Sequence, residues 1–124
     1  MSEDNKTTQK QTTTDPVVLE METKYPEMTR EFKRLMKSQY ELFCKKMNNY
    51  GKGNIMLGGD INNEFDRKIA ISGVVIRLND KSNRLINLTL KGTTDSVNEP
   101  IMDAFIDMCN YSIIAQIVHN EKWK

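Results

Sequence analysis

The sequence contains few of the residues that metal centres and covalent catalysis most often use. It has one histidine and two cysteines among 124 residues. One histidine cannot supply a zinc ligand set, and it leaves a Ser-His-Asp or Cys-His arrangement without its other members. His119 lies near the end of the last predicted helix, where we favour a dipole interaction over a role as catalytic base. Cys44 and Cys109 follow no metal-ligand spacing, and we predict buried, reduced thiols.

Long apolar runs and a net charge of one sign are also missing. No apolar run approaches 18 residues, so we expect no transmembrane helix, and the polar start lacks the apolar region of a signal peptide. Lys and Arg number 18 against 17 Asp and Glu, so the chain is not a basic protein that coats nucleic acid. These absences predict a cytoplasmic protein with no membrane partner and no strong case for direct nucleic-acid binding. Any electrostatic function must come from local separation of charge.

The domain boundary is predicted from the first 15 residues. They contain no apolar residue after Met1, so they cannot bury enough surface to offset the entropy of ordering. We predict a disordered polar tail over residues 1–15 and a single helical domain over residues 16–124. Residues 16–19 form a short apolar patch that we expect to dock loosely on that domain.

Apolar residues at helical spacing predict a first long helix from Pro26 to about residues 48–51. Its apolar face is formed by Met28, Phe32, Leu35, Met36, Gln39, Tyr40, Phe43 and Met47. The glycine-rich stretch "NNYGKGNIMLGGD" should end this helix and form a long irregular loop.

Two further helices are predicted after this loop. The second covers about residues 62–90, with Gly73 expected where another helix crosses closely or where the helix is broken, and Gly92 just past its end. The third begins at about residue 98, capped by Asn98 or Glu99 with Pro100 in its first turn. Its predicted apolar stripe is Met102, Phe105, Ile106, Cys109, Ile113, Gln116 and Ile117.

Three main helices without a hairpin signal predict an all-α protein, a small helical bundle. Three helices make a thin core for a chain of this length. We therefore expect oligomerisation to complete the bundle, most simply as a homodimer around a two-fold axis.

Charged residues recur at helical spacing on both of the last two predicted helices. The bases are Arg77, Lys81 and Arg84, and the acids are Glu99, Asp103 and Asp107, with Asp80 as a further carboxylate. One explanation is structural: the acids pair with the bases and hold the two helices in register. The other is functional: the acids bind a divalent cation, Mg²⁺ or Mn²⁺ because the ligands are all oxygen, while the bases hold phosphate. Spacing alone favours the first explanation, and the second is our hypothesis for the site.

Three segments follow one another over about residues 46–117: "NNYGKG", "GVVIRLNDKSNRLINL" and "VNEPIMDAFIDMCNYSIIA". In this order they resemble a family of small phage and prophage proteins, the nucleotide modification associated domain, type one. The matching positions are Tyr50, Gly51, Gly73, Arg77, Asp80, Lys81, Arg84, Leu85, Glu99, Asp103, Asp107, Asn110 and Tyr111. The chain departs from the family in having Asn49 for an aspartate, Asn98 before Glu99, and Ala104 where threonine is common.

The resemblance implies phage nucleotide metabolism or DNA base modification in the cytoplasm of the host cell. A more distant similarity is to the all-α nucleoside triphosphate pyrophosphatases, whose helical metal motif the acids of the third helix resemble. Those enzymes use a second acidic motif, E-E-x-x-E, which Glu64, Asp66 and Asp80 do not reproduce. Whether the protein is an enzyme is therefore left open.

Three functions remain in competition. In the first, the protein binds a nucleotide phosphate through Arg77, Lys81 and Arg84; its enzymatic form would use Mg²⁺ held by Glu99, Asp103 and Asp107 for hydrolysis between the α and β phosphates. In the second, a non-catalytic oligomer sequesters a nucleotide, for example a host immune signalling nucleotide, with Tyr50 or Tyr111 stacking on it and without a metal. Gly51 is a further predicted nucleotide-binding residue. In the third, the bundle is purely structural or partner-binding and the charges form salt bridges.

Overall fold

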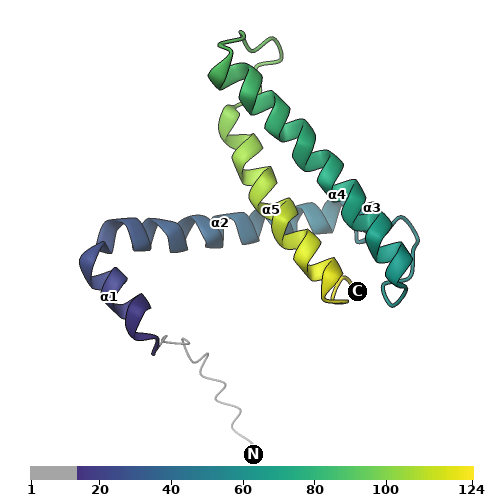
Figure 1. Cartoon of the computed structure of the whole chain (residues 1–124), viewed down its shortest axis with the longest axis horizontal. Helices are drawn as coiled ribbons and strands as arrows, with labels where there is room; N and C mark the ends of the chain where they lie inside the picture. The colour runs from purple at the N-terminus through teal and green to yellow at the C-terminus, as the bar shows by residue number, and fades with distance from the viewer. Residues whose placement is uncertain (1–13) are drawn as a thin grey trace, which may run out of the picture. The chain divides into compact units, whose positions relative to one another are not determined.

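The computed structural model describes residues 14–124, and every regular element in that range is a helix (Figure 1), so the all-α prediction is confirmed. Residues 1–13, most of the predicted disordered tail, lie outside the described residues. The elements in chain order are α1 (Pro16–Lys24), α2 (Pro26–Tyr50), α3 (Gly53–Met56), α4 (Glu64–Leu85), the π-helix η1 (Ile86–Leu90) and α5 (Ile101–His119).

The described chain divides into two compact units, one ending at Ser38 and one running from Gln39 to Lys124. The predicted domain, residues 16–124, takes in the second unit and most of the first. In the first unit, α1 begins at Pro16 because the side chain of Asp15 caps it, accepting from the backbone N–H of Val17 at 2.8 Å. Residues 16–19 form the first turn of this helix, and their expected docking on the domain stays a prediction.

The first unit leaves much of its apolar surface uncovered. The predicted helix from Pro26 is confirmed by α2, yet neither α1 nor α2 contains a fully buried side chain. Phe32 is 66% exposed, beside a shallow apolar groove that Val17, Val18 and Met21 help to line. Lys33 forms an ion pair with Glu22 that links α2 to α1.

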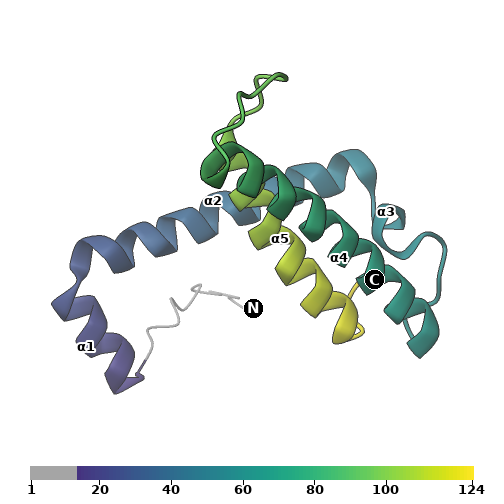
Figure 2. The ribbon, with the colours of Figure 1, turned by 45° about the horizontal axis from the view of Figure 1, so that its top comes forward.

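The second unit is built around α4 and α5, which lie side by side (Figures 1 and 2). The short helix α3 packs against α4, and the C-terminal half of α2 adds partly buried apolar side chains. The buried core cluster consists of Ile55, Met56, Ala70, Val74, Ile114, Val118 and Trp123. This unit carries every residue of the candidate site.

The glycine-rich loop after α2 is more ordered than the sequence suggested. The helix α2 ends at Tyr50, and Gly51 adopts a positive φ of 67°, as predicted. The loop then forms α3, whose Ile55 and Met56 are 5% and 9% exposed and belong to the core. A continuous irregular loop was therefore the wrong prediction, because these two apolar side chains fold the segment onto α4.

Asn63 is the N-cap residue of the long helix α4, and its side-chain oxygen accepts a hydrogen bond from the backbone N–H of Asp66 at 3.0 Å. It continues through the π-helical turn η1, and Gly92 with a φ of 67° follows, so the predicted second helix is confirmed within a few residues. A Cβ added at Gly73 would meet no atom within 4 Å, so the close helix crossing expected there is wrong.

The buried face of α5 differs from the predicted stripe. Met102, Phe105 and Ile113 are exposed, whereas Ala104, Ile114 and Val118 are buried. The helix is apolar nearly all round, so its sequence did not identify the face that packs. Pro100 is the N-cap residue of α5 and does not lie in its first turn, and neither Asn98 nor Glu99 caps it with a side chain. The predicted burial of Cys44 and Cys109 is also wrong, because both thiols are exposed.

By length and composition alone, α5 could cross a membrane, and it is the one helix of the described residues for which this holds. The core helix of a soluble protein meets the same criterion.

Candidate functional site

A pocket of about 370 Å³ opens in the second unit among α2, α3, α4 and α5. It is lined by Phe43, Lys46, Met47, Tyr50, Asn54, Ile55, Arg77, Asn110, Tyr111, Ile114 and Trp123. Aromatic rings, two amides and two cations share the lining, and no carboxylate is among these residues. The pocket thus combines apolar surface with a few polar groups, as small-molecule sites usually do.

Arg77 is the central cation of this pocket. Its Nη2 donates a hydrogen bond to the backbone carbonyl of Asn54 at 3.1 Å, which ties α4 to α3. Its guanidinium carbon lies 5.6 Å from the ring centroid of Tyr111, within range of a cation–π contact. Within residues 14–124, no carboxylate lies close enough to form an ion pair with it. A guanidinium carries five N–H donors, so most of them remain available to an anion.

Asn54 brings an amide group to the same pocket. Its side-chain oxygen is buried and accepts no hydrogen bond from any described residue. A buried acceptor without a donor costs about 1–3 kcal/mol, so rotation of this amide toward a bound N–H donor would be favourable. The other amide of the lining, Asn110, is occupied, because its Nδ2 donates to the backbone carbonyl of Gln39 at 3.2 Å.

The aromatic wall of the pocket comes from both ends of the second unit. Tyr50 is 67% exposed at the end of α2, so one face of its ring is open to a ligand. Trp123 is buried, packs edge to face on Phe43 at 6.0 Å, and donates from Nε1 to the backbone carbonyl of Lys52 at 2.9 Å. Sequence reasoning missed Trp123, although a lone tryptophan within the charged segment "EKWK" was a usable signal.

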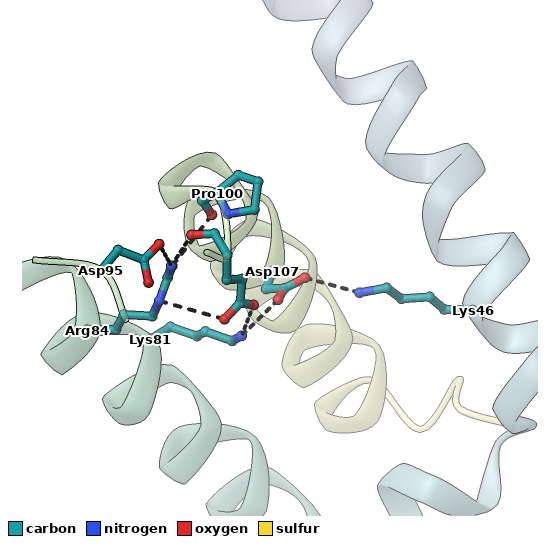
Figure 3. Close-up of polar contacts among 7 residues, drawn as sticks. Lys46, Lys81, Arg84, Asp95, Pro100 and Asp107 are labelled. Atoms are coloured by element: carbon teal, nitrogen blue, oxygen red, sulfur yellow. Dashed lines mark hydrogen bonds and ion pairs between the residues drawn. The ribbon is translucent and has the colours of Figure 1, made fainter. Parts of the chain in front are cut away.

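One helical turn from Arg77, Lys81 lies in a different environment. Its Nζ is 3.1 Å from Asp107 and 3.9 Å from Glu99. Asp107 also forms an ion pair with Lys46 of α2, whose Nζ lies 3.1 Å from Oδ1 of Asp107. Figure 3 shows the carboxylate of Asp107 between the two lysines. The hydrogen bond to Asp107 raises the pKa of Lys81 above its ordinary value. Partial burial raises the pKa of Asp107, but the hydrogen bonds from Lys81 and Lys46 outweigh it and keep that pKa below its ordinary value.

Arg84 makes the densest set of polar contacts in this unit (Figure 3). It lies 3.7 Å from Asp95 and 3.7 Å from Glu99, and it donates to the backbone carbonyls of Glu99 and Pro100. Only 17% of its side chain is exposed. Arg84 therefore fixes the loop before α5 to the end of α4.

The structure divides the predicted nucleotide-binding residues into two groups. Arg77, Tyr50 and Tyr111 line the pocket, whereas Lys81 and Arg84 do not belong to its lining. Gly51 also lies outside the lining and ends α2. The ion pairs expected under the structural explanation are present for Lys81 and Arg84. Phosphate binding by these two bases stays a prediction.

The predicted metal ligands are not gathered into one cluster. Glu99 and Asp107 are paired with bases, while Asp80 and Asp103 are exposed. Across the described range, no three His, Cys, Asp or Glu side chains are placed to hold a metal ion together. This arrangement does not fit a Mg²⁺ site formed by the four predicted carboxylates.

The model of the family described as nucleotide modification associated domain 1 matches residues 46–118, more than half of the chain. The match includes every residue of the pocket lining except Phe43 and Trp123. No curated protein and no solved structure matches the chain.

Proposed function

This chain belongs to the nucleotide modification associated domain 1 family, and we propose that it binds a nucleotide in the pocket lined by Arg77. The observation that carries the proposal is the setting of Arg77. It is a cation without a carboxylate partner among the described residues, and it shares the pocket with open aromatic rings and the unpaired oxygen of Asn54.

Each part of a nucleotide has a matching group in this pocket. Arginine binds phosphate through several N–H donors at once, which gives Arg77 a role toward the phosphate. Aromatic side chains stack on bases of any sequence, which suits the open ring of Tyr50. Once the buried amide of Asn54 turns toward the pocket, its oxygen accepts an N–H of the base or a sugar hydroxyl. The family's association with nucleotide modification is consistent with a role in nucleotide metabolism or DNA base modification, as the phage-type resemblance implies.

The lining favours binding without turnover. Hydrolysis between phosphates would need a carboxylate or a carboxylate-held metal to activate water, and the pocket lining contains no carboxylate. This supports the non-catalytic alternative, in which the protein sequesters its nucleotide, over a Mg²⁺-dependent pyrophosphohydrolase acting at this pocket.

The experiment that tests the proposal is calorimetric titration with a panel of nucleotides, with and without Mg²⁺, on the wild type and on Arg77→Met. The matched control is Lys68→Met, which removes an exposed cation from the same helix. We expect the wild type and the control to bind at least one nucleotide with equal affinity, and Arg77→Met to lose at least tenfold. Chromatography of the mixture should return intact nucleotide; Mg²⁺-dependent product would favour the enzymatic form. Equal binding by Arg77→Met would contradict the proposal.

We further propose that the protein is a homo-oligomer. Phe65, Ile69 and Ile76 lie on one face of α4 and are all exposed, which leaves an apolar surface outside the small core. A second copy of the chain would cover such a face as a symmetric dimer does. Light scattering at micromolar concentration should give at least a dimer, and Phe65→Glu should lower the mass. A wild-type mass of 14.4 kDa would contradict this.

A further inference from the structure

The pocket presents two cations to its ligand, Arg77 and Lys46, and no anion. Resting on the proposed function, we propose that the ligand is a nucleoside monophosphate whose phosphate is bound by these two side chains without a metal ion. A phosphomonoester carries a charge of about −1.5 to −2 at pH 7, which two cations balance. A triphosphate carries more charge and normally brings Mg²⁺, which is held in part by protein carboxylates that this lining lacks.

The size of the pocket supports the same ligand. Its volume of about 370 Å³ lies at the small end of ligand sites, which span about 300–1,000 Å³. One base, one sugar and one phosphate suit that volume better than a dinucleotide or a triphosphate does. With the phosphate at Arg77 and Lys46, the remaining part of the ligand lies against Tyr50 and Asn54, which line the same pocket.

Lys46 can turn to the phosphate because its ion-pair partner, Asp107, also pairs with Lys81. Its Nζ contacts Asp107 at 3.1 Å, and half of its side chain is exposed. Asp107 keeps a second partner, Lys81, also at 3.1 Å, so the carboxylate remains paired when Lys46 turns to the ligand. Asp107 is therefore an internal anion that competes with the phosphate for Lys46, and it acts as a positioning residue that lowers the affinity.

The test is a titration in EDTA with a 2′-deoxynucleoside, its 5′-monophosphate and its 5′-triphosphate for each of the four bases, with ribose 5-phosphate as the base-free probe. We expect at least one monophosphate to bind tenfold or more tightly than its nucleoside and than ribose 5-phosphate. Its triphosphate should bind no tighter, and Mg²⁺ should not change this order.

Two variants test the roles of the charges. Lys46→Met should weaken monophosphate binding by about tenfold and leave nucleoside binding unchanged, whereas Asp107→Asn should strengthen monophosphate binding by about threefold or more. Lys45→Met, which removes an adjacent exposed lysine that does not line the pocket, is the matched control. Circular dichroism establishes whether each variant is folded. If Asp107→Asn does not fold, Lys46→Met still tests the inference.

The outcomes separate this inference from the proposed function. A triphosphate or a cyclic dinucleotide that binds tighter than every monophosphate, or binding that requires Mg²⁺, would overturn the inference and leave nucleotide binding in place. Monophosphate affinity that is unchanged in Lys46→Met would overturn it as well. Failure of all nucleotides to bind would instead contradict the proposed function itself.

Discussion

Two stretches of α4, one turn apart, carry cations in opposite settings. Arg77 faces an aromatic ring and a backbone carbonyl, whereas Lys81 faces two carboxylates. The neighbouring helix decides this difference. Lys81 faces Asp107 of α5, and Arg77, one turn away on α4, faces Tyr111, which is one turn away from Asp107 on α5. The first base therefore meets an acid and the second an aromatic ring. Basic residues at helical spacing thus take different roles according to the side chains of the facing helix.

The largest effect should come from the pocket side of this comparison, where packing dominates. Trp123→Ala removes a buried ring and its hydrogen bond to Lys52, and we expect a loss of about 3–5 kcal/mol in the free energy of unfolding. Chemical denaturation measures this loss. Tyr50→Ala is the matched control, because its ring is exposed and its removal should change stability by less than about 0.5 kcal/mol. A stable Trp123→Ala protein would show that the pocket wall is not part of the core.

The next effect tests the ion-pair side. Arg84→Met removes the ion pair of Asp95 and the donor to the carbonyl of Pro100, and it leaves Glu99 with Lys81 alone, so we expect a loss of about 2–3 kcal/mol in the free energy of unfolding. Nucleotide affinity should stay within about twofold, because Arg84 does not line the pocket. Paired denaturation and titration measurements decide the matter. Unchanged stability with weakened binding would instead assign Arg84 to the phosphate site that we hypothesised from the sequence.

Arg77→Met should give the reverse pattern. Loss of its charge-assisted hydrogen bonds to phosphate should weaken nucleotide binding by about 1.5–2.5 kcal/mol, tenfold or more, while stability falls by about 1 kcal/mol or less. Arg77→Lys should recover only part of the affinity, since a lysine presents a point charge without the planar fork. If Arg77→Met destabilises the protein as much as Arg84→Met does, Arg77 has a structural role like that of Arg84.

The smallest effect concerns pH. Because Asp107 has a lowered pKa in the folded protein, its contribution to stability is present above the ordinary value of about 3.9 and is lost as the pH falls through the folded pKa. Lys81 has a raised pKa, so its contribution is lost only above about pH 10.4. Asp107→Asn should therefore reduce the fall in the free energy of unfolding below about pH 4, as acid denaturation at a series of pH values measures. Asp103→Asn, which removes an exposed carboxylate from the same helix, is the control variant.

The sequence predicted the long helices well because their ends carry local signals. Pro26 begins α2 and Gly51 follows it, and both positions are explained by backbone geometry within a single turn. The packing face of α5 could not be predicted, since apolar residues surround that helix and only the placement of α4 selects Ile114 and Val118.

Part of the candidate site was also predictable. Arg77, Tyr50 and Tyr111 were named from their residue types and from the family pattern. Lys46 and Asn54 were not, because nothing in the local sequence of either separates it from a solvent-exposed residue. Trp123 was missed as well, although a lone tryptophan in a charged segment was a usable signal. Spacing alone also could not separate Arg77 from Lys81, because the difference lies on α5.

The hydrogen bond from Trp123 to Lys52 joins residues 71 positions apart, and so does the bond from Asn110 to Gln39. The contacts of Arg84 with residues 99 and 100 span only 15 and 16 positions. Closing a longer loop costs more chain entropy, so the hairpin of α4 and α5 should form early in folding and the C-terminal half of α2 should dock late. Interactions made after the transition state govern the unfolding rate more than the folding rate. A bound nucleotide should therefore lower the unfolding rate and leave the folding rate nearly unchanged.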